Sequence, residues 1–458
     1  MQLDFLIQKD TDWLGANGLL VKFAIIHLIS LPYPLLLLIY AKYSLETIPK
    51  RLEGDHWIED IMYVTRPLSL YRQTPSSLSL PPPEGPNSGY IVIQDEESVD
   101  TCCFGLCKDY KFRDLPFPQN KMLTVRYGTG AGENRWESHD DAYFIPVLNQ
   151  PLSSNLYYVI KAHRRHKGEA YRSSTQEDMA TCCFCRCVSD VKPKALDHQD
   201  IYQQFEIKPW QGFCGPSRGG FTAKPVAPDG IPPQFLRRKG WEIYASTPKH
   251  YQLGEAQGLD ASLRAHLPDL DFTPETKISR TVVVGKWYSP FMFIKEGDNL
   301  KDQMKRSMFY EVTLEQQWEQ IYACENTLSE SNTVAIDVYV QKEVVLISGT
   351  VVAQNDTNVV DGVIWFRAPE SPEGELSVGL SLVVAERMRW EQERVGWNGG
   401  KDRQVRVERV EEFGGEKSRW RKFGCYVLVE RFVFKRMDGS ILLSYEFRHT
   451  HQIQSKWD

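Results

Sequence analysis

The chain has 458 residues, which is too long for one ordinary hydrophobic core, so two or three packed units are expected. Hydrophobic residues make up 42% of the chain and charged residues 25%, and these are the values of an ordinary globular protein. The formal net charge of −6 excludes nucleic acid as a general partner, because binding to a phosphate backbone requires a basic surface.

The first 61 residues differ from the rest because they contain a long uncharged run. Residues 23–41 (FAIIHLISLPYPLLLLIYA) carry no formal charge and are long enough to cross a bilayer as a helix. A membrane anchor there would leave the body of the protein in the cytoplasm, because cations are more numerous on the C-terminal flank of the run. The alternative interpretation is a dispensable N-terminal extension, so membrane contact through residues 23–41 stays open.

Residues 62–225 are expected to form a duplicated, cysteine-rich β module. A Pro/Ser-rich connector leads into an apolar strand pattern at residues 90–93, and a similar pattern occurs at residues 157–160. Each pattern is followed by a polar stretch and then by a cysteine-dense motif, TCCFGLC at 101–107 and TCCFCRC at 181–187. The repeated order predicts two copies that pack as a pseudo-symmetric pair.

The two motifs contain seven of the ten cysteines. Ten cysteines are too few for a disulfide scaffold of this length, and adjacent cysteines bridge with difficulty, so we expect reduced thiols in the cytoplasm. Pairing the two copies would bring together Cys103, Cys107, Cys183 and Cys187. Four thiolates can hold a structural zinc ion, and no other cofactor is expected. S-acylation and burial in equivalent strands are the alternatives, and burial is favoured because free Cys is among the most buried residue types.

The middle stretch, residues 226–279, is rich in Pro and Gly and is expected to connect two β-rich parts. It contains one short helix pattern at residues 258–267. Asp260 lies near the start of this pattern and Pro268 follows its end, and both residue types are typical of helix boundaries.

Residues 280–458 are expected to form an antiparallel β domain. Residues 426–435 and 441–449 flank Asp438-Gly439, a dipeptide that favours a tight hairpin turn. In the second arm, one face holds Ile441, Leu443, Tyr445 and Phe447 and the other holds Leu442, Ser444, Glu446 and Arg448, which predicts a sheet whose second face is exposed to solvent. Further strand patterns occur at residues 281–284 and at Ile336, Val338 and Val340. The sequence therefore predicts a mainly β, β-rich α+β fold with few short helices.

Two polar motifs could bind ligands. The run KAHRRHK at residues 161–167 could hold a phosphate or an anionic lipid head group, although a solvated charge run is the simpler interpretation. His449 and His451 share a strand face, but the sequence shows no third metal ligand near them. The glycine-rich residues 127–133 are typical of a turn, because no Lys-Ser or Lys-Thr completes a phosphate loop. No catalytic motif is found, which favours a non-enzymatic role.

A series of longer motifs follows in order along the chain. They are MYVTRPLSLYR (62–72), LPPPEGPNSG (80–89), TCCFGLC (101–107), LPFPQN (115–120), PVLNQPLS (146–153), HKGEA (166–170), TCCFCRC (181–187) and IYQQFE (201–206). The series resembles the plant-specific family of domain of unknown function 1262, over roughly residues 62–457. The resemblance implies a plant source and carries no established catalytic residues, and some family members are labelled insecticidal crystal toxin-like. Residues 1–61 lie outside the family pattern, which favours the extension interpretation.

The prediction for function is a non-catalytic, β-rich interaction protein with a protein partner, acting in stress or defence responses. One alternative is a membrane-active protein that resembles β pore formers. Charged stretches such as residues 386–394 (ERMRWEQER) count against strand insertion, since a lipid-facing strand surface has to be uncharged. Another alternative is a structural module stabilised by zinc.

Overall fold

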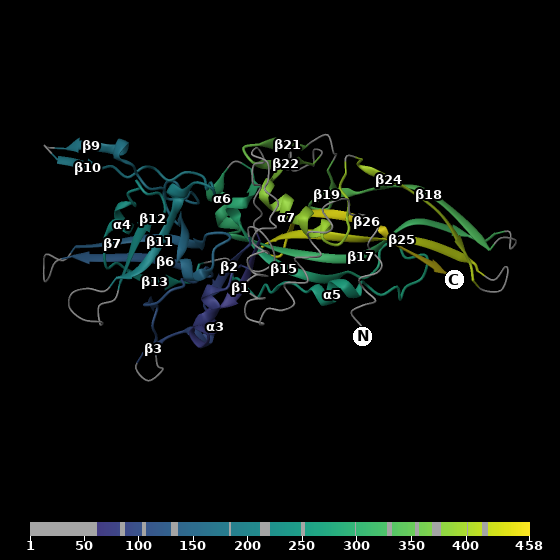
Figure 1. The fold of residues 1–458 in the computed structure, drawn as a ribbon, viewed down its shortest axis with the longest axis horizontal. Coiled ribbons are helices and arrows are strands. Elements are labelled where there is room, and N and C mark those ends of the chain that lie inside the picture. The colour runs from purple at the N-terminus through teal and green to yellow at the C-terminus, as the bar shows by residue number, and fades with distance from the viewer. Residues whose placement is uncertain are drawn as a thin grey trace, which may run out of the picture. The chain divides into compact units, whose positions relative to one another are not determined.

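The chain divides into two units, residues 1–57 and residues 58–458, and all described residues belong to the second. The computed structural model (Figure 1) describes residues 62–82, 88–102, 107–129, 136–182, 185–210, 220–248, 252–297, 299–327, 332–352, 357–368, 377–400, 402–414 and 420–458, apart from the side chains of residues 102, 181–186 and 357. The expected membrane segment at residues 23–41 lies outside these ranges. Within them, no helix is both long and apolar enough to cross a bilayer.

The mainly β fold is confirmed, and the largest sheet has nine strands. In order across the sheet these are β2 (Ser88–Ile93), β1 (Met62–Pro67), β15 (Val282–Pro290), β17 (Phe309–Glu325), β25 (Lys422–Arg436), β26 (Ile441–Trp457), β19 (Glu343–Ile347) and β20 (Thr350–Val351), while β14 (Gly258–Leu259) pairs with β15. Figure 1 shows the long strands β17, β25 and β26 side by side. All pairs in the sheet are antiparallel except β1 with β2, which is parallel.

A second sheet has seven strands, all antiparallel to their neighbours. Its order is β12 (Gly220–Pro225), β11 (Gln204–Trp210), β8 (Leu156–Lys161), β7 (Trp136–Pro146), β6 (Met122–Thr129), β13 (Glu242–Ser246) and β5 (Lys111–Phe112). A four-stranded sheet contains β16 (Ile294–Glu296), β23 (Ser377–Ser381), β22 (Val363–Arg367) and β21 (Thr357–Val360). One core cluster of buried apolar side chains includes residues from all three sheets.

The remaining strands form three two-stranded sheets. They are β18 (Thr333–Gln341) with β24 (Gln404–Glu412), β3 (Thr101–Cys102) with β4 (Cys107–Lys108), and β9 (Met179–Cys182) with β10 (Cys185–Val188). The helices are short: α3 (Leu68–Gln73), α4 (Gln234–Arg237), α5 (Ala261–His266), α6 (Leu300–Arg306) and α7 (Leu382–Glu393). The 3-10 turns are η1 (Pro75–Ser79), η2 (Glu96–Ser98), η5 (Leu152–Ser154), η6 (Gln176–Asp178), η7 (Ile201–Gln203) and η9 (Phe291–Phe293).

Several local predictions are confirmed. The hairpin of β25 and β26 turns at Asp438-Gly439, where Gly439 has a φ of 85° that residues with side chains rarely adopt. The helix predicted over residues 258–267 is α5, which begins three residues later than expected. Its N-cap is Asp260, whose side chain accepts a hydrogen bond from the Leu263 backbone N–H. The turn dipeptide and the helix N-cap both depend on neighbouring residues only, so both could be predicted from the sequence.

The predicted duplication is not confirmed. The two strand patterns that should be equivalent lie in different sheets, since β2 belongs to the nine-stranded sheet and β8 to the seven-stranded one. The cysteine motifs do form similar antiparallel hairpins, β3–β4 and β9–β10. The repeated motif therefore specifies a repeated hairpin.

The expectation of one solvent-exposed face on the second hairpin arm is wrong. Leu442 and Glu446, which were expected on the exposed side, are buried. Arg448 donates hydrogen bonds to Glu319 and Glu446, and Arg431 forms an ion pair with Glu315 on the neighbouring strand. The charged side chains of this face thus pair across the strands, so alternation along one strand does not reveal their burial.

Candidate functional site

The cysteines of the predicted zinc site lie in two separate hairpins. Cys103 and Cys183 fall outside the described residues. Cys107 in β4 forms a disulfide, and Cys187 in β10 is an exposed free thiol. The described part of the chain contains no group of three or more His, Cys, Asp or Glu side chains that could hold a metal ion. The four-cysteine zinc site stays a prediction, while the expectation of reduced thiols is wrong at Cys107.

His449 and His451 do lie together, with ring centroids 5.3 Å apart. Each ring has a hydrogen-bond partner in or just after α7. His449 Nε2 lies 2.7 Å from Gln392 Oε1, and His451 Nε2 lies 3.1 Å from the Val395 carbonyl oxygen. These contacts attach the middle of β26 to α7 and the residues just after it, which explains the pair without a metal ion.

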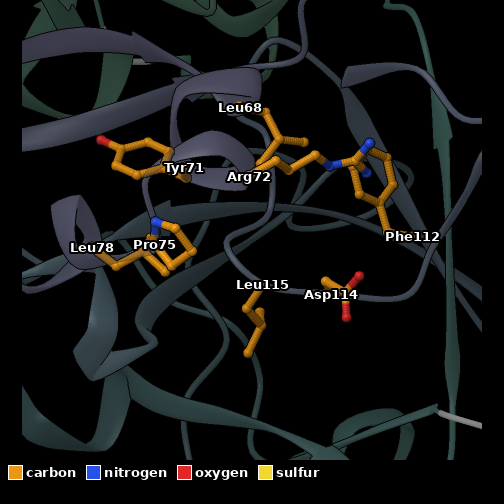
Figure 2. A pocket seen from close by; sticks show the side chains of 8 residues that line it. All are labelled: Leu68, Tyr71, Arg72, Pro75, Leu78, Phe112, Asp114 and Leu115. Carbon is orange, nitrogen blue, oxygen red and sulfur yellow. The ribbon is translucent and has the colours of Figure 1, made fainter. Parts of the chain in front are cut away.

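A small hollow of about 240 Å³ lies beside α3. Figure 2 shows side chains of α3 and η1 on one side of it and those of the segment from Phe112 to Leu115 on the other. Most of the lining is apolar. Its one arginine, Arg72, already donates to the Ser98 carbonyl oxygen and to Asp100, so its charge is engaged within the protein. This hollow therefore offers little to fix a polar ligand.

A larger pocket combines cations with apolar surface, and we call it the cationic pocket. It measures about 490 Å³ and is lined by Met122, Tyr143, Ala162, His163, Lys167, Thr247, Pro248, Met304, Lys305 and Met308. Its volume lies within the range typical of small-molecule sites. Strands β6 and β7, the loop after β8, the segment after β13 and helix α6 all contribute to its wall.

The loop after β8 contains the KAHRRHK run and brings two of its cations to the pocket. The loop closes through backbone hydrogen bonds between Lys161 and the segment Gly168-Glu169. Gly168 has a φ of 89°, and a Cβ atom there would lie 3.3 Å from the Phe291 ring, so glycine fits this close turn. The turn directs His163 and Lys167 into the pocket.

The other cations of the run have different roles. His166 Nδ1 lies 2.7 Å from the Glu169 carboxylate, and the Lys161 ammonium lies 5.6 Å from the centre of the Tyr171 ring. Arg164 and Arg165 are exposed. Two basic residues of the run therefore line the pocket and two are exposed to solvent, and the sequence alone does not show which residue has which role.

Helix α6 supplies Met304 and Lys305 to the opposite wall. A buried glutamine holds the helix in place. The two N–H groups of the Gln303 side-chain amide are shared among three acceptors, the backbone carbonyl oxygens of Phe291 and Ile294 and the Tyr310 hydroxyl. Because these are buried polar contacts, the position of α6 is well specified, and with it the distance between the two walls.

Lys167 has more cations than anions near it. Among the described residues it forms no ion pair. Burial, and then the nearby Lys305 and Lys301, lower its pKa, while Asp302 acts in the opposite direction. Lys305 has an acidic partner, Asp302, at 2.8 Å. The protein thus keeps a half-buried ammonium group beside two other cations, an arrangement that an anionic ligand would relieve.

Two more basic groups lie at the rim. The Lys121 ammonium donates a hydrogen bond of 3.2 Å to the Thr247 hydroxyl. Burial is the main cause that lowers the pKa of Lys121, and repulsion from Lys108 is the smaller one. His163 Nε2 lies 3.5 Å from the Asp141 carboxylate. The Tyr143 hydroxyl stays protonated, since burial raises its pKa to about 12. The wall therefore presents neutral and cationic donors together with three methionine side chains.

A second charged region, which we call the ionic cluster, joins α5, α7 and the long strands. Its members are Arg264, Gln316, Arg387, Glu391, Gln392, Glu430 and His449, and each is at most 5% exposed. Arg264 donates to both oxygens of Glu430 and to Glu391. Gln316 also donates to Glu430, and Arg387 donates to Glu391.

The cluster is electrically balanced. Burial opposes the ionisation of Glu430, but hydrogen bonds and the charge of Arg264 outweigh it and hold the pKa of Glu430 below its usual value. Burial also lowers the pKa of His449 to about 4, so its imidazole is neutral near pH 7. Two guanidinium groups thus face two carboxylates in the protein interior, and this arrangement stabilises the fold without calling for a ligand.

Comparisons with known proteins show similarity to one family model and to solved structures. A family model described as "Protein of unknown function (DUF1262)" matches residues 84–184. A solved structure, "Crystal structure of Cry35Ab1", is similar with a TM-score of 0.42 and 9% sequence identity, over 74% of this chain and 90% of that chain. No curated protein matches the sequence. The family resemblance is thus supported over residues 84–184, while the plant source stays a prediction.

Proposed function

We propose that the chain is a non-catalytic binding protein whose ligand is an amphiphilic anion held in the cationic pocket. The observation that carries this proposal is Lys167, a half-buried ammonium group that forms no ion pair among the described residues and lines the same pocket as three methionine side chains. The anionic head of the ligand would contact Lys167 and Lys305, and its apolar part would lie against Met304 and Met308.

Both halves of the ligand gain free energy from the site. A charge-assisted hydrogen bond from an ammonium group is worth about 1.5–3 kcal/mol. Each methylene group that leaves water contributes about 0.8 kcal/mol. Methionine side chains are flexible and polarizable, so this wall can accommodate apolar groups of different shapes. The pocket would therefore select for charge more strictly than for the form of the apolar chain.

The membrane-active alternative is not proposed. Strands β17, β25 and β26 carry charged side chains on both faces, with the ionic cluster on one face and the Arg448–Glu319 and Arg431–Glu315 pairs on the other. Moving such side chains into lipid is costly. A protein partner, a cytoplasmic location and a role in stress or defence stay predictions.

Isothermal titration calorimetry on the full chain tests the proposal. We expect decanoate to bind, and decyltrimethylammonium and decyl maltoside, which carry the same chain on a cationic or a neutral head, to bind at least about tenfold more weakly. Lys167→Gln should weaken decanoate binding by a similar factor. Lys224→Gln, which alters an exposed lysine of β12, is the matched control. Equal binding of the three amphiphiles would refute the proposal.

A further inference from the structure

We infer that the cationic pocket selects a doubly charged head group, specifically a phosphate monoester attached to an apolar chain. This inference rests on the proposed function and specifies the ligand of the same site. It follows from the number of charges around the pocket and from the positions of the donors on its walls.

The balance of charge around the pocket favours a dianion. Four ammonium groups and two carboxylates lie in or beside it; they belong to Lys121, Lys167, Lys301, Lys305, Asp141 and Asp302. Two positive charges are left over among these six groups. A carboxylate would neutralise one of them, whereas a phosphate monoester above its second pKa of about 6 would neutralise both.

The donors also come from different directions. Lys167 and His163 lie on the loop after β8, Lys305 lies on α6, and Lys121 reaches the rim through the Thr247 hydroxyl. A phosphate monoester has three terminal oxygens that can accept from three separate donors, and a carboxylate has two that lie in one plane. A lysine ammonium is a compact point charge with rotatable donors, which suits phosphate oxygens approached from several sides.

The apolar wall distinguishes this ligand from free phosphate. Met122, Met304 and Met308 line the same pocket as the cations, so a bare inorganic ion would leave them in contact with water. An alkyl chain on the phosphate would cover them and gain the free energy of burial. The combined chemistry is that of a single-chain phosphate amphiphile.

The test is calorimetric titration of the full chain with three probes at low salt and about pH 8, where a phosphate monoester is dianionic. The probes are decyl phosphate, decyl methyl phosphate and inorganic phosphate. The first two share the chain and the phosphorus atom but differ by one charge. We expect decyl phosphate to bind about tenfold more tightly than its methyl ester. Inorganic phosphate should bind more weakly than decyl phosphate by at least about two orders of magnitude, because it buries no methylene groups.

Variants connect the preference to the pocket. Lys305→Gln removes a largely exposed ammonium group, so the variant should fold normally. The affinity for decyl phosphate should then exceed that for decyl methyl phosphate only about twofold. Lys224→Gln should leave the ratio of the two affinities unchanged. Equal affinity for the two decyl probes would overturn the inference while leaving the proposed function in place. Equal affinity for inorganic phosphate and decyl phosphate would overturn the claim that the pocket binds the apolar chain. If neither decyl probe nor decanoate bound, the proposed function would be overturned as well.

Discussion

The ionic cluster and the cationic pocket both take lysine or arginine side chains out of bulk water, but they balance the charge differently. In the cluster, Arg264 is 5% exposed and its guanidinium group meets Glu430 and Glu391 within 2.9 Å. In the pocket, the charged groups that affect Lys167 are two cations, Lys305 and Lys301, and one anion, Asp302. The protein therefore pairs Arg264, which holds its sheet to its helices, with two carboxylates, and leaves Lys167, which lines a cavity, without an ion pair among the described residues. Such a difference is expected if Lys167 serves a ligand.

The largest effect should come from breaking the cluster. Arg264→Met would leave two carboxylates buried with too few donors, and we expect it to lower the free energy of unfolding by about 3–5 kcal/mol in urea titrations. Arg406→Met provides the control, because Arg406 pairs with Asp337 on the exposed face of β18 and β24. Because this pair is exposed to solvent, Arg406→Met should lower the free energy of unfolding far less than Arg264→Met. Similar losses in the two variants would show that the cluster is not a structural centre.

The pH dependence of stability should report on His449. Its pKa in the folded protein is about 4, below the ordinary value of 6.5, so the unfolded chain takes up the proton first. Stability from this group is complete above about pH 6.5 and is lost as the pH falls towards 4. We expect a loss of about 2 kcal/mol between about pH 7.5 and pH 5, seen as a shift of the urea midpoint. His449→Gln should remove this component, and an unchanged pH profile in that variant would contradict the assignment.

Salt should separate the two regions. Raising NaCl from about 20 mM to about 500 mM should weaken the binding of decyl phosphate at least about threefold, since the pocket is open to solvent and its charges are screened. The destabilisation caused by Arg264→Met should stay nearly constant over the same range, because the cluster is buried. Binding that is insensitive to salt would indicate that the apolar wall alone holds the ligand.

The smallest effect on stability is expected at Lys167. Lys167→Met keeps the apolar stem and removes an ammonium group that lies beside Lys305 and Lys301. Unfolding in urea should require the same free energy as in the wild type or up to about 1 kcal/mol more, since repulsion between exposed or half-exposed charges is weak. A loss of stability would mean that the folded protein uses this charge for its own structure.

The sequence predicts those features whose signals are local. Asp260 begins α5 and Asp438-Gly439 closes the β25–β26 hairpin, because capping and turn formation depend on neighbouring residues. The buried second face of that hairpin was missed, because Arg448 is satisfied by Glu319 of another strand, and alternation along one strand does not show its partners.

The cationic pocket could be predicted only in part. The KAHRRHK run was compatible with an anion site, although a solvated charge run was the simpler interpretation, and two of its residues, His163 and Lys167, line the pocket. Met304, Lys305 and Met308 come from a segment about 140 residues further along the chain, with no motif that connects them to the run. The shared cysteine motif predicted two equivalent modules that pack as a pseudo-symmetric pair. The motif specifies only a hairpin, so it does not determine which sheet the strand before each hairpin, β2 or β8, belongs to.

The most direct test of the central claim measures two quantities on the same Lys167→Met protein: its affinity for decyl phosphate by calorimetry and its free energy of unfolding in urea. If the pocket holds charge for a ligand, affinity falls about tenfold while stability is unchanged or slightly higher. If affinity is unchanged, or if stability falls by several kcal/mol, the unpaired charge of Lys167 does not serve a ligand and the account is contradicted.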